Sequence, residues 1–340
     1  MNNLSTIRSI IDLAGEQPRL WARLAVGGAL TAGFITSAAN TWAQTEFPTK
    51  PIRMMVPFTA GSGADGSARI LAEQMQRSLG QSVLVENRPG GSGAVAAIAV
   101  KQAAADGHTI MVASNSPMSV NPIVMKNPGY DAVKDFKAVH GISRSMNVWY
   151  AANESPFKNI GELITAGKAK ALNIGSYSAG YQLGIAWLSN LSQARLTYVP
   201  YKGQSQVIND VIGRQLDAGM GDLGGALPLI KAGKIRALAV SGEARHPSLP
   251  DVMTIRELYS EYANYAWTSF YVRAETPPAA HAKLVEAMKK GLASKEAANY
   301  FLANGSEPMM DFGPERMTKY QLDEIERFRK IADAAGIKAE

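Results

Sequence analysis

Strand-forming runs that end in glycine-rich loops and lead into helical patterns recur along this chain. Residues 52–58 are rich in strand formers and stop at a Gly/Ser turn, and apolar residues then recur at helical spacing from Asp65 to Leu79. Further strands are expected at 82–86 and 108–113, with an alanine-rich helix at 94–104 between them. Strands that alternate with helices in this way predict an α/β protein with parallel, doubly wound sheets.

The same alternation continues to the C-terminus. Strands are expected at 148–151, 171–175, 196–199, 216–220, 236–241 and 265–273, and helices at 160–168, about 182–191, 205–213, 227–232, 279–293, 295–304 and 314–335. The chain is expected to cross between two domains near 146–150 and 264–268. The prediction is therefore a discontinuous lobe 1 (44–147 plus 267–340) and a lobe 2 (148–266) that close on each other by a hinge.

Polar and glycine-rich loops follow several of the expected strands, at 59–66, 87–93, 114–119 and 176–182. In open α/β sheets, ligands bind outside the carboxyl ends of the strands, so these loops should converge on one cleft. Loop 176–182 offers hydroxyl and amide groups with aromatic walls. Asp222 follows another strand and is expected to bind an amine or to belong to the hinge. The candidate ligand-binding residues are Phe58, Ala60, Gly61, Ser62, Gly63, Ala64, Asp65, Ser114, Asn115, Ser116, Tyr177, Ser178, Ala179, Gly180, Tyr181, Gln182 and Asp222.

The loop from Gly61 to Gly66 satisfies the dinucleotide pattern G-x-G-x-x-G. Against a dinucleotide, the turn is lengthened by two residues, and Asp65 places a negative charge where a pyrophosphate would sit. Free N–H groups and the positive end of the helix dipole favour any anion, so we expect a carboxylate here. Asp65 is expected to cap the helix by accepting from N–H groups two or three residues on. A tight turn without a ligand is the alternative.

The N-terminus has the order of a signal peptide. Basic residues, including Arg19 and Arg23, precede an apolar run at 24–35 and then small residues. Cleavage is expected after Ala43, or alternatively after Ala39, so that the mature chain begins near Gln44. A retained membrane anchor and an amphipathic helix are the alternatives, although the apolar run is shorter than the ~20 residues that span a bilayer. We therefore expect a periplasmic protein, and export argues against an enzyme that needs soluble ATP or NAD and favours the capture of nutrients.

Composition argues against several other classes. The net charge of +6 comes from scattered basic residues, so no nucleic-acid partner is expected. The absence of cysteine excludes disulfides, thiol nucleophiles and thiolate-bound metals. The four histidines lack metal-ligand spacing: His108, His140, His246 and His281. The segment from Ser176 to Gly180 resembles a nucleophile elbow but lacks its first glycine, and no His/Asp pair can be assigned to it. No catalytic residue, cofactor or metal is therefore predicted.

Several blocks in one order carry a family likeness. They are Val56-Pro57-Phe58 with its glycine loop, Glu86-Asn87-Arg88-Pro89-Gly90, Val199-Pro200-Tyr201-Lys202-Gly203, the run from Lys231 to Val240, and Leu249-Pro250-Asp251-Val252. In these blocks the chain resembles the Bug family of solute-binding receptors of tripartite tricarboxylate transporters. The resemblance implies a type II periplasmic binding-protein fold with a cleft between two lobes. It further implies that main-chain groups and waters at 58–65 and 176–182 hold the carboxylates of the ligand.

The functional hypothesis is reversible, non-catalytic capture of a small carboxylate or related organic anion by a monomer without a cofactor. The resemblance implies delivery of this solute to the subunits of a membrane transporter. One alternative is an exported, hydrolase-like enzyme that acts on a carboxylated or ester substrate through Ser178 or Asp65. The other is a receptor domain that signals to a sensor partner.

Overall fold

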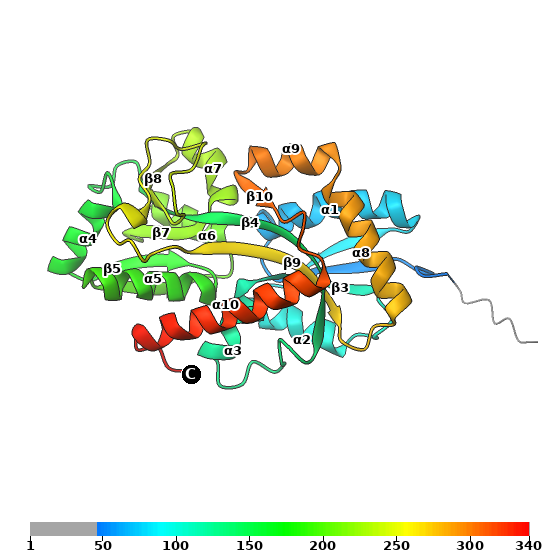
Figure 1. Cartoon of the computed structure of the whole chain (residues 1–340). Coiled ribbons are helices and arrows are strands. Elements are labelled where there is room, and N and C mark those ends of the chain that lie inside the picture. The colour runs from blue at the N-terminus through cyan, green and yellow to red at the C-terminus, as the bar shows by residue number, and fades with distance from the viewer. Residues whose placement is uncertain (1–45, 340) are drawn as a thin grey trace, which may run out of the picture. The chain divides into compact units, whose positions relative to one another are not determined.

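The computed structural model describes residues 46–339, and the compact unit considered below begins at Phe47 (Figure 1). The expected signal peptide and its cleavage site near Ala43 lie outside the described residues. Within 46–339, no helix combines the length and the hydropathy that crossing a membrane requires.

The first sheet is built around three parallel strands. Strand β1 (Ile52–Val56) lies between β2 (Val83–Asn87) and β3 (Thr109–Ser114). Strand β9 (Tyr265–Arg273) pairs antiparallel with β3, and the first part of β4 (Phe136–Ala152) pairs antiparallel with β9. The short β10 (Ser306–Pro308) pairs with β4 at Ser143–Ser145. We call this sheet and the helices packed on it lobe 1.

The second sheet repeats the parallel core. Strand β5 (Leu172–Ser176) lies between β6 (Leu196–Pro200) and β7 (Ala218–Asp222). The last part of β4 pairs antiparallel with β7 and with β8 (Ile235–Val240). We call this sheet and its helices lobe 2. Strand β4 therefore belongs to both sheets, and it passes from one to the other at Asn147 (Figure 1).

Helices cover both sheets. Those of lobe 1 are α1 (Gly63–Leu79), η1 (Gly91–Gly93), α2 (Ala94–Gln102), η2 (Ser116–Val120), α3 (Asn121–Val124), α8 (Pro278–Leu292) and α9 (Lys295–Ala303). Those of lobe 2 are α4 (Ile160–Ala169), α5 (Ala179–Ser192), α6 (Gln204–Ile212), α7 (Leu223–Lys231) and η3 (Ile255–Glu257). The last helix, α10 (Pro314–Ala334), contacts α3, η2 and β4 as well as α5 of lobe 2 (Figure 1).

Apolar residues at helical spacing place one face of α1 in the core of lobe 1. Ala68, Leu71 and Met75 recur at helical spacing, are fully buried, and belong to the same core as Ile52 and Met54 of β1. Burying a leucine or methionine side chain such as Leu71 or Met75 stabilises the fold by about 1.5–3 kcal/mol. The helix thus packs on the sheet along one face, with its N-terminus next to the end of β1.

Three chain segments are tied together where β4 changes sheets. The amide N–H of Asn147 donates to Ser241 Oγ at 2.8 Å, and the Ser241 N–H donates to the Asn147 carbonyl at 3.0 Å. The Asn264 N–H, just before β9, donates to the Ser241 carbonyl at 3.0 Å. All three residues are buried. This hydrogen-bonded node lies at both of the expected crossovers, while the division into lobes that move separately stays a prediction.

The sequence predicted the parallel strands of both sheets, and it predicted β8, β9 and the end of β4 as strands, but not their antiparallel pairing. The first half of β4 and the short β10 were not expected, and β8 and β9 run antiparallel to their neighbours. Two irregularities in the β4–β9 register, at Ala138/His140 and Gly141/Ser143, interrupt the alternation by which a strand is recognised. The expected parallel core is present in each sheet, and both sheets are mixed because β9 pairs antiparallel with β3 and β4 pairs antiparallel with β7.

Candidate functional site

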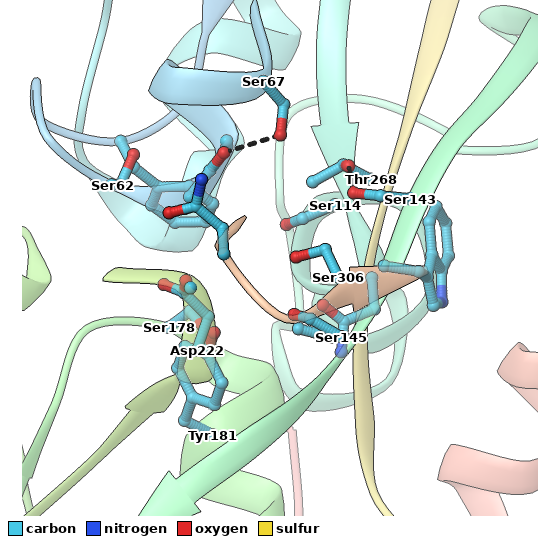
Figure 2. Close-up of a pocket in the computed structure, with 18 of the residues that line it drawn as sticks. Ser62, Ser67, Ser114, Ser143, Ser145, Ser178, Tyr181, Asp222, Thr268 and Ser306 are labelled. Carbon is cyan, nitrogen blue, oxygen red and sulfur yellow. Dashed lines mark hydrogen bonds between the residues drawn. The ribbon is translucent and has the colours of Figure 1, made fainter. Parts of the chain in front are cut away.

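A cavity that is partly open to solvent lies between the two lobes (Figure 2). Seven of its lining residues are serines, and Asp222 is the one charged residue among the described residues that line it. The lining residues are Phe58, Ser62, Gly63, Ala64, Ser67, Ser114, Asn115, Ser143, Ser145, Tyr177, Ser178, Tyr181, Asp222, Gly224, Ala266, Trp267, Thr268, Tyr300, Asn304 and Ser306. The site is polar without any lining lysine, arginine or histidine in the described part of the chain.

The start of α1 forms one end of the cavity. Ser62 is the N-cap, with extended backbone (φ −73°, ψ 158°), and its Oγ accepts from the Asp65 N–H at 3.3 Å. Its carbonyl accepts from the Gly66 N–H at 3.0 Å. The N–H groups of Gly63 and Ala64 have no acceptor among the described residues, as expected for the first turn of a helix. Both residues line the cavity, so two unpaired donors and the helix dipole are available to an anion.

The expected role of Asp65 as the cap was wrong. Its carboxylate turns back along the chain and accepts from the Gly61 N–H at 3.0 Å and from Asn87 Nδ2 at 2.9 Å. Arg69, one turn later on α1, donates to it at 3.1 Å. Burial opposes the charged form, but these hydrogen bonds and the Arg69 charge hold the pKa of Asp65 below its ordinary value. The shorter Ser62 side chain reaches the helix N–H groups instead, and Asp65 fixes the loop from outside the cavity.

Asp222 lies opposite the start of α1. It is the N-cap of α7, where one carboxylate oxygen accepts from the Gly225 N–H at 2.8 Å, and the other accepts from the Tyr177 hydroxyl at 2.6 Å. It contacts lobe 1 so closely that a β-carbon on Gly63 would lie 2.5 Å from Asp222 Oδ1. Asp222 is 7% exposed and has no ion-pair partner among the described residues.

The charge of Asp222 acts on several buried phenols. Burial first, and the nearby Asp222 carboxylate second, raise the pKa values of Tyr177 and Tyr181 well above the ordinary value. The same two causes, in the same order, raise the pKa of Tyr300 to about 12. These hydroxyl groups therefore stay protonated. The Tyr177 proton is donated to Asp222, so the Tyr177 hydroxyl is left to accept from a ligand.

The start of α5, on the lobe 2 side, is already paired. The Ala179 N–H donates to Ser92 Oγ at 3.1 Å, and the Gly180 N–H donates to Ser116 Oγ at 3.0 Å. Both acceptors belong to lobe 1. The rings of Phe58 and Tyr177 also meet across the cavity, in an edge-to-face contact with centroids 5.5 Å apart. In this conformation the two lobes are thus in direct contact, and serine hydroxyl oxygens of lobe 1 accept the hydrogen bonds of the first two N–H groups of α5.

A hydroxyl-rich wall faces Asp222 from the lobe 1 side. Ser143 and Ser145 lie on β4, Thr268 on β9 and Ser306 on β10. Ser143 and Thr268 pair at 3.2 Å, whereas Ser114 Oγ is buried and has no partner. Figure 2 shows Ser114 and Ser306 with their oxygens turned toward the space that separates them from Asp222.

The cavity contains part of the predicted site. The predicted residues that line it are Phe58, Ser62, Gly63, Ala64, Ser114, Asn115, Tyr177, Ser178, Tyr181 and Asp222. The predicted residues that do not line it are Ala60, Gly61, Asp65, Ser116, Ala179, Gly180 and Gln182. Ala179 and Gln182 instead border a separate surface hollow with the segment 336–338. No residue of loop 87–93 lines the cavity, but Ser92 contacts the start of α5 and Asn87 Nδ2 donates to the carbonyl of the lining residue Phe58 at 3.0 Å.

Ten lining residues were not expected from the sequence. They are Ser67, Ser143, Ser145, Gly224, Ala266, Trp267, Thr268, Tyr300, Asn304 and Ser306. The serines at 143 and 145 share one face of a strand, so recognition of β4 would have indicated them. Tyr300, Asn304 and Ser306 come from the C-terminal part of the chain, and no local pattern marks them.

The histidines and Ser176, which stands at the first-glycine position of the elbow-like segment, take contacts outside the cavity, whereas Ser178 lines it. None of the four histidines lines the cavity, and each contacts a backbone group or an acidic side chain outside it: His108, His140, His246 and His281. Ser176 Oγ donates to the Met220 carbonyl at 2.6 Å and is fully buried. No group of three or more histidine, aspartate or glutamate side chains within the described residues could hold a metal ion.

Comparison with known sequences identifies relatives along most of the chain. The family model described as the tripartite tricarboxylate transporter family receptor, TctC, matches residues 67–337. Protein BugT of Bordetella pertussis is 31% identical over 320 residues, which cover 91% of this chain and 95% of that protein. A UPF0065 protein of Bordetella bronchiseptica is 31% identical over 303 residues, which cover 88% of each chain.

Solved structures agree with this relationship. The periplasmic binding protein BugD is 28% identical and covers 86% of this chain and all of its own, with a TM-score of 0.82. An R. palustris protein determined with adipate is 29% identical, with the same coverage and a TM-score of 0.83. MatC of Rhodopseudomonas palustris with bound malate is 26% identical, covers 84% of this chain and 99% of its own, and has a TM-score of 0.79. The chain therefore has the two-lobed α/β fold of these proteins and belongs to the tripartite tricarboxylate transporter receptors, the TctC or Bug family of periplasmic solute-binding proteins.

Proposed function

We propose that this receptor binds one small carboxylate in the cavity between its lobes. The observation that carries the proposal is the start of α1, where the Gly63 and Ala64 N–H groups have no protein acceptor and line the cavity. The dipole of a 17-residue helix adds to their attraction for an anion. The adipate and malate bound by two structural neighbours support the same ligand class.

In this mechanism main-chain donors bind the carboxylate, since no basic side chain lines the cavity within the described residues. Tyr177 and Tyr181 contribute hydroxyl groups from lobe 2. The ligand carboxylate is held at lobe 1, and lobe 2 closes over it through the contacts of Ser92 and Ser116 with α5. The free energy of this closure adds to the ligand affinity.

We also propose that the protein is exported with cleavage near Ala43, acts as a monomer, and delivers its solute without chemical change to the membrane subunits of a transporter. The family assignment supports the transporter as the partner. A sensor partner would be distinguished by identifying the membrane protein that is retained by the ligand-bound receptor. Catalysis would be detected as turnover of esters that is lost in Ser178→Ala.

The test is a titration of the mature chain, beginning at Gln44, by isothermal calorimetry. The panel contains aliphatic mono-, di- and tricarboxylates, aromatic acids and α-amino acids, with the corresponding amides and sugars as controls without a carboxylate. We expect saturable binding of at least one carboxylate at one site per chain. Binding of a neutral sugar with no response to any carboxylate would reject the proposal.

A further inference from the structure

The cavity contains one buried negative charge of its own, and this charge restricts the ligand. Asp222 lines the cavity, is 7% exposed and has no ion-pair partner among the described residues. Its carboxylate lies beside Gly63, where a β-carbon would come within 2.5 Å of Oδ1. An anion bound to the Gly63 and Ala64 N–H groups would therefore lie next to a second anion. In a buried site like charges repel strongly, and no lining side chain in the described part of the chain is cationic.

Asp222 is itself stabilised by the start of α7, which it caps, and by the Tyr177 hydroxyl, so any further positive charge in the cavity would come from the ligand. A group on the carbon next to the ligand carboxylate would face Asp222, because Asp222 lies beside the N–H groups that would hold the carboxylate. Each Asp222 oxygen accepts one hydrogen bond, from Gly225 or Tyr177, and each has a further lone pair. An α-ammonium group would supply both the charge and the donors.

The opposite wall restricts the rest of the ligand. Ser114 Oγ is buried, with 6% of the residue exposed, has no hydrogen-bond partner and is turned into the cavity (Figure 2). A buried hydroxyl without a partner carries a free-energy cost that a polar ligand group would remove. Ser143, Ser145, Thr268 and Ser306 add hydroxyl groups that can both donate and accept. With no ionic side chain on this wall, a second ligand carboxylate would lack a counter-charge there.

We propose, resting on the carboxylate-binding function above, that the solute is an α-amino acid with a polar, uncharged side chain. Its carboxylate binds the Gly63 and Ala64 N–H groups, its ammonium group binds Asp222, and its side chain binds Ser114 and the neighbouring hydroxyls. The ligand is thus neutral overall, unlike a dicarboxylate.

The experiment compares ligands that differ only in the α-substituent. The wild-type protein is titrated calorimetrically with L-serine against L-glycerate, L-alanine against L-lactate, and L-aspartate against L-malate. L-asparagine, L-glutamine and L-threonine complete the panel. We expect an uncharged polar amino acid to bind at least tenfold more tightly than its hydroxy-acid counterpart and than any dicarboxylate.

Two variants test the assigned contacts. Asp222→Asn keeps the size of the side chain and an acceptor for the α7 cap but removes the charge, so it should abolish the preference for the amino acid over the hydroxy acid. Asp251→Asn, at an exposed aspartate outside the cavity, is the matched control and should keep that preference. Ser114→Ala should weaken L-asparagine or L-glutamine binding at least threefold and leave L-alanine unchanged.

The outcomes separate the two proposals. If malate or another dicarboxylate binds and no amino acid does, the amino-acid assignment is overturned while carboxylate binding stands. An amino-acid preference that persists in Asp222→Asn also overturns the assignment. If no carboxylate of any kind binds, the underlying function fails, and the assignment fails with it.

Discussion

The starts of α1 and α5 face the same cleft, yet they differ in what their N–H groups contact. At α1, Ser62 caps the helix and the next two N–H groups are left to the cavity. At α5, the Ser178 side chain makes no capping hydrogen bond, and serine hydroxyls from lobe 1 accept from the first two N–H groups of the helix. The difference teaches that a helix terminus at a cleft can bind a ligand or bind the opposite lobe, and that the partner across the cleft decides between these roles.

The largest expected effect is a loss of ligand affinity when a side chain is added at Gly63, at the start of α1. Gly63→Ala would place a β-carbon 2.5 Å from Asp222 Oδ1, closer than two such atoms can approach. Overpacking of this kind costs about 1–3 kcal/mol, so the closed form is destabilised and ligand affinity should weaken roughly 5- to 150-fold. Calorimetry with the best ligand of the screen measures the change. Gly313→Ala, at a helix start with open space around it, is the control. Wild-type affinity in Gly63→Ala would show that α1 is not the binding terminus.

A second variant removes the support of the α1 loop. Asp65→Ala would leave the Gly61 N–H without its acceptor and the Asn87 amide with only the Phe58 carbonyl, which should lower the free energy of unfolding by about 1–3 kcal/mol. Urea denaturation followed by circular dichroism measures this value.

The Asp65 carboxylate also makes the free energy of unfolding depend on pH. The pKa of Asp65 is lower in the folded protein than its ordinary value of 3.8, so the unfolded chain binds the proton more readily. Its stabilisation is therefore complete well above pH 3.8 and is lost as the pH falls through the folded-state pKa. The difference in the free energy of unfolding between wild type and Asp65→Asn should therefore shrink as the pH falls below 3.8. A difference that stays constant down to pH 3 would contradict the assigned role.

The smallest expected effect concerns α5. Ser92→Ala or Ser116→Ala would remove the acceptor of one α5 N–H group in the closed form, which costs about 1 kcal/mol and should weaken affinity roughly fivefold. Ser82→Ala, outside the cavity, controls for the substitution itself. The direction of the change in ligand affinity is informative. A ligand that binds the N–H groups at the start of α5 would bind more tightly once the serine hydroxyl no longer pairs with them.

The sequence was sufficient to predict the free N–H groups at the start of α1 but not the pairing of those at the start of α5. Gly63 and Ala64 were expected from a strand, a glycine loop and a helix that are adjacent in the chain. Pairing of Gly180 with Ser116 depends on contact between the two lobes, which no local pattern records. The hydroxyl wall was missed for a similar reason, since β10 brings Ser306 beside Ser145 from a distant part of the chain.

Strand β9 has a consequence for the order of folding. The free edge of β3 is covered only when Met111 pairs with Tyr271, and β4 joins the first sheet through the same strand. The parallel strands of lobe 1 therefore keep an exposed, apolar edge until the C-terminal third of the chain has emerged, whereas lobe 2 contains strands β5 to β8 in one continuous segment. Contacts over such sequence separations form slowly, and unpaired edges favour aggregation. A chain that is shortened before residue 273 should thus collect as insoluble material even though lobe 2 is intact.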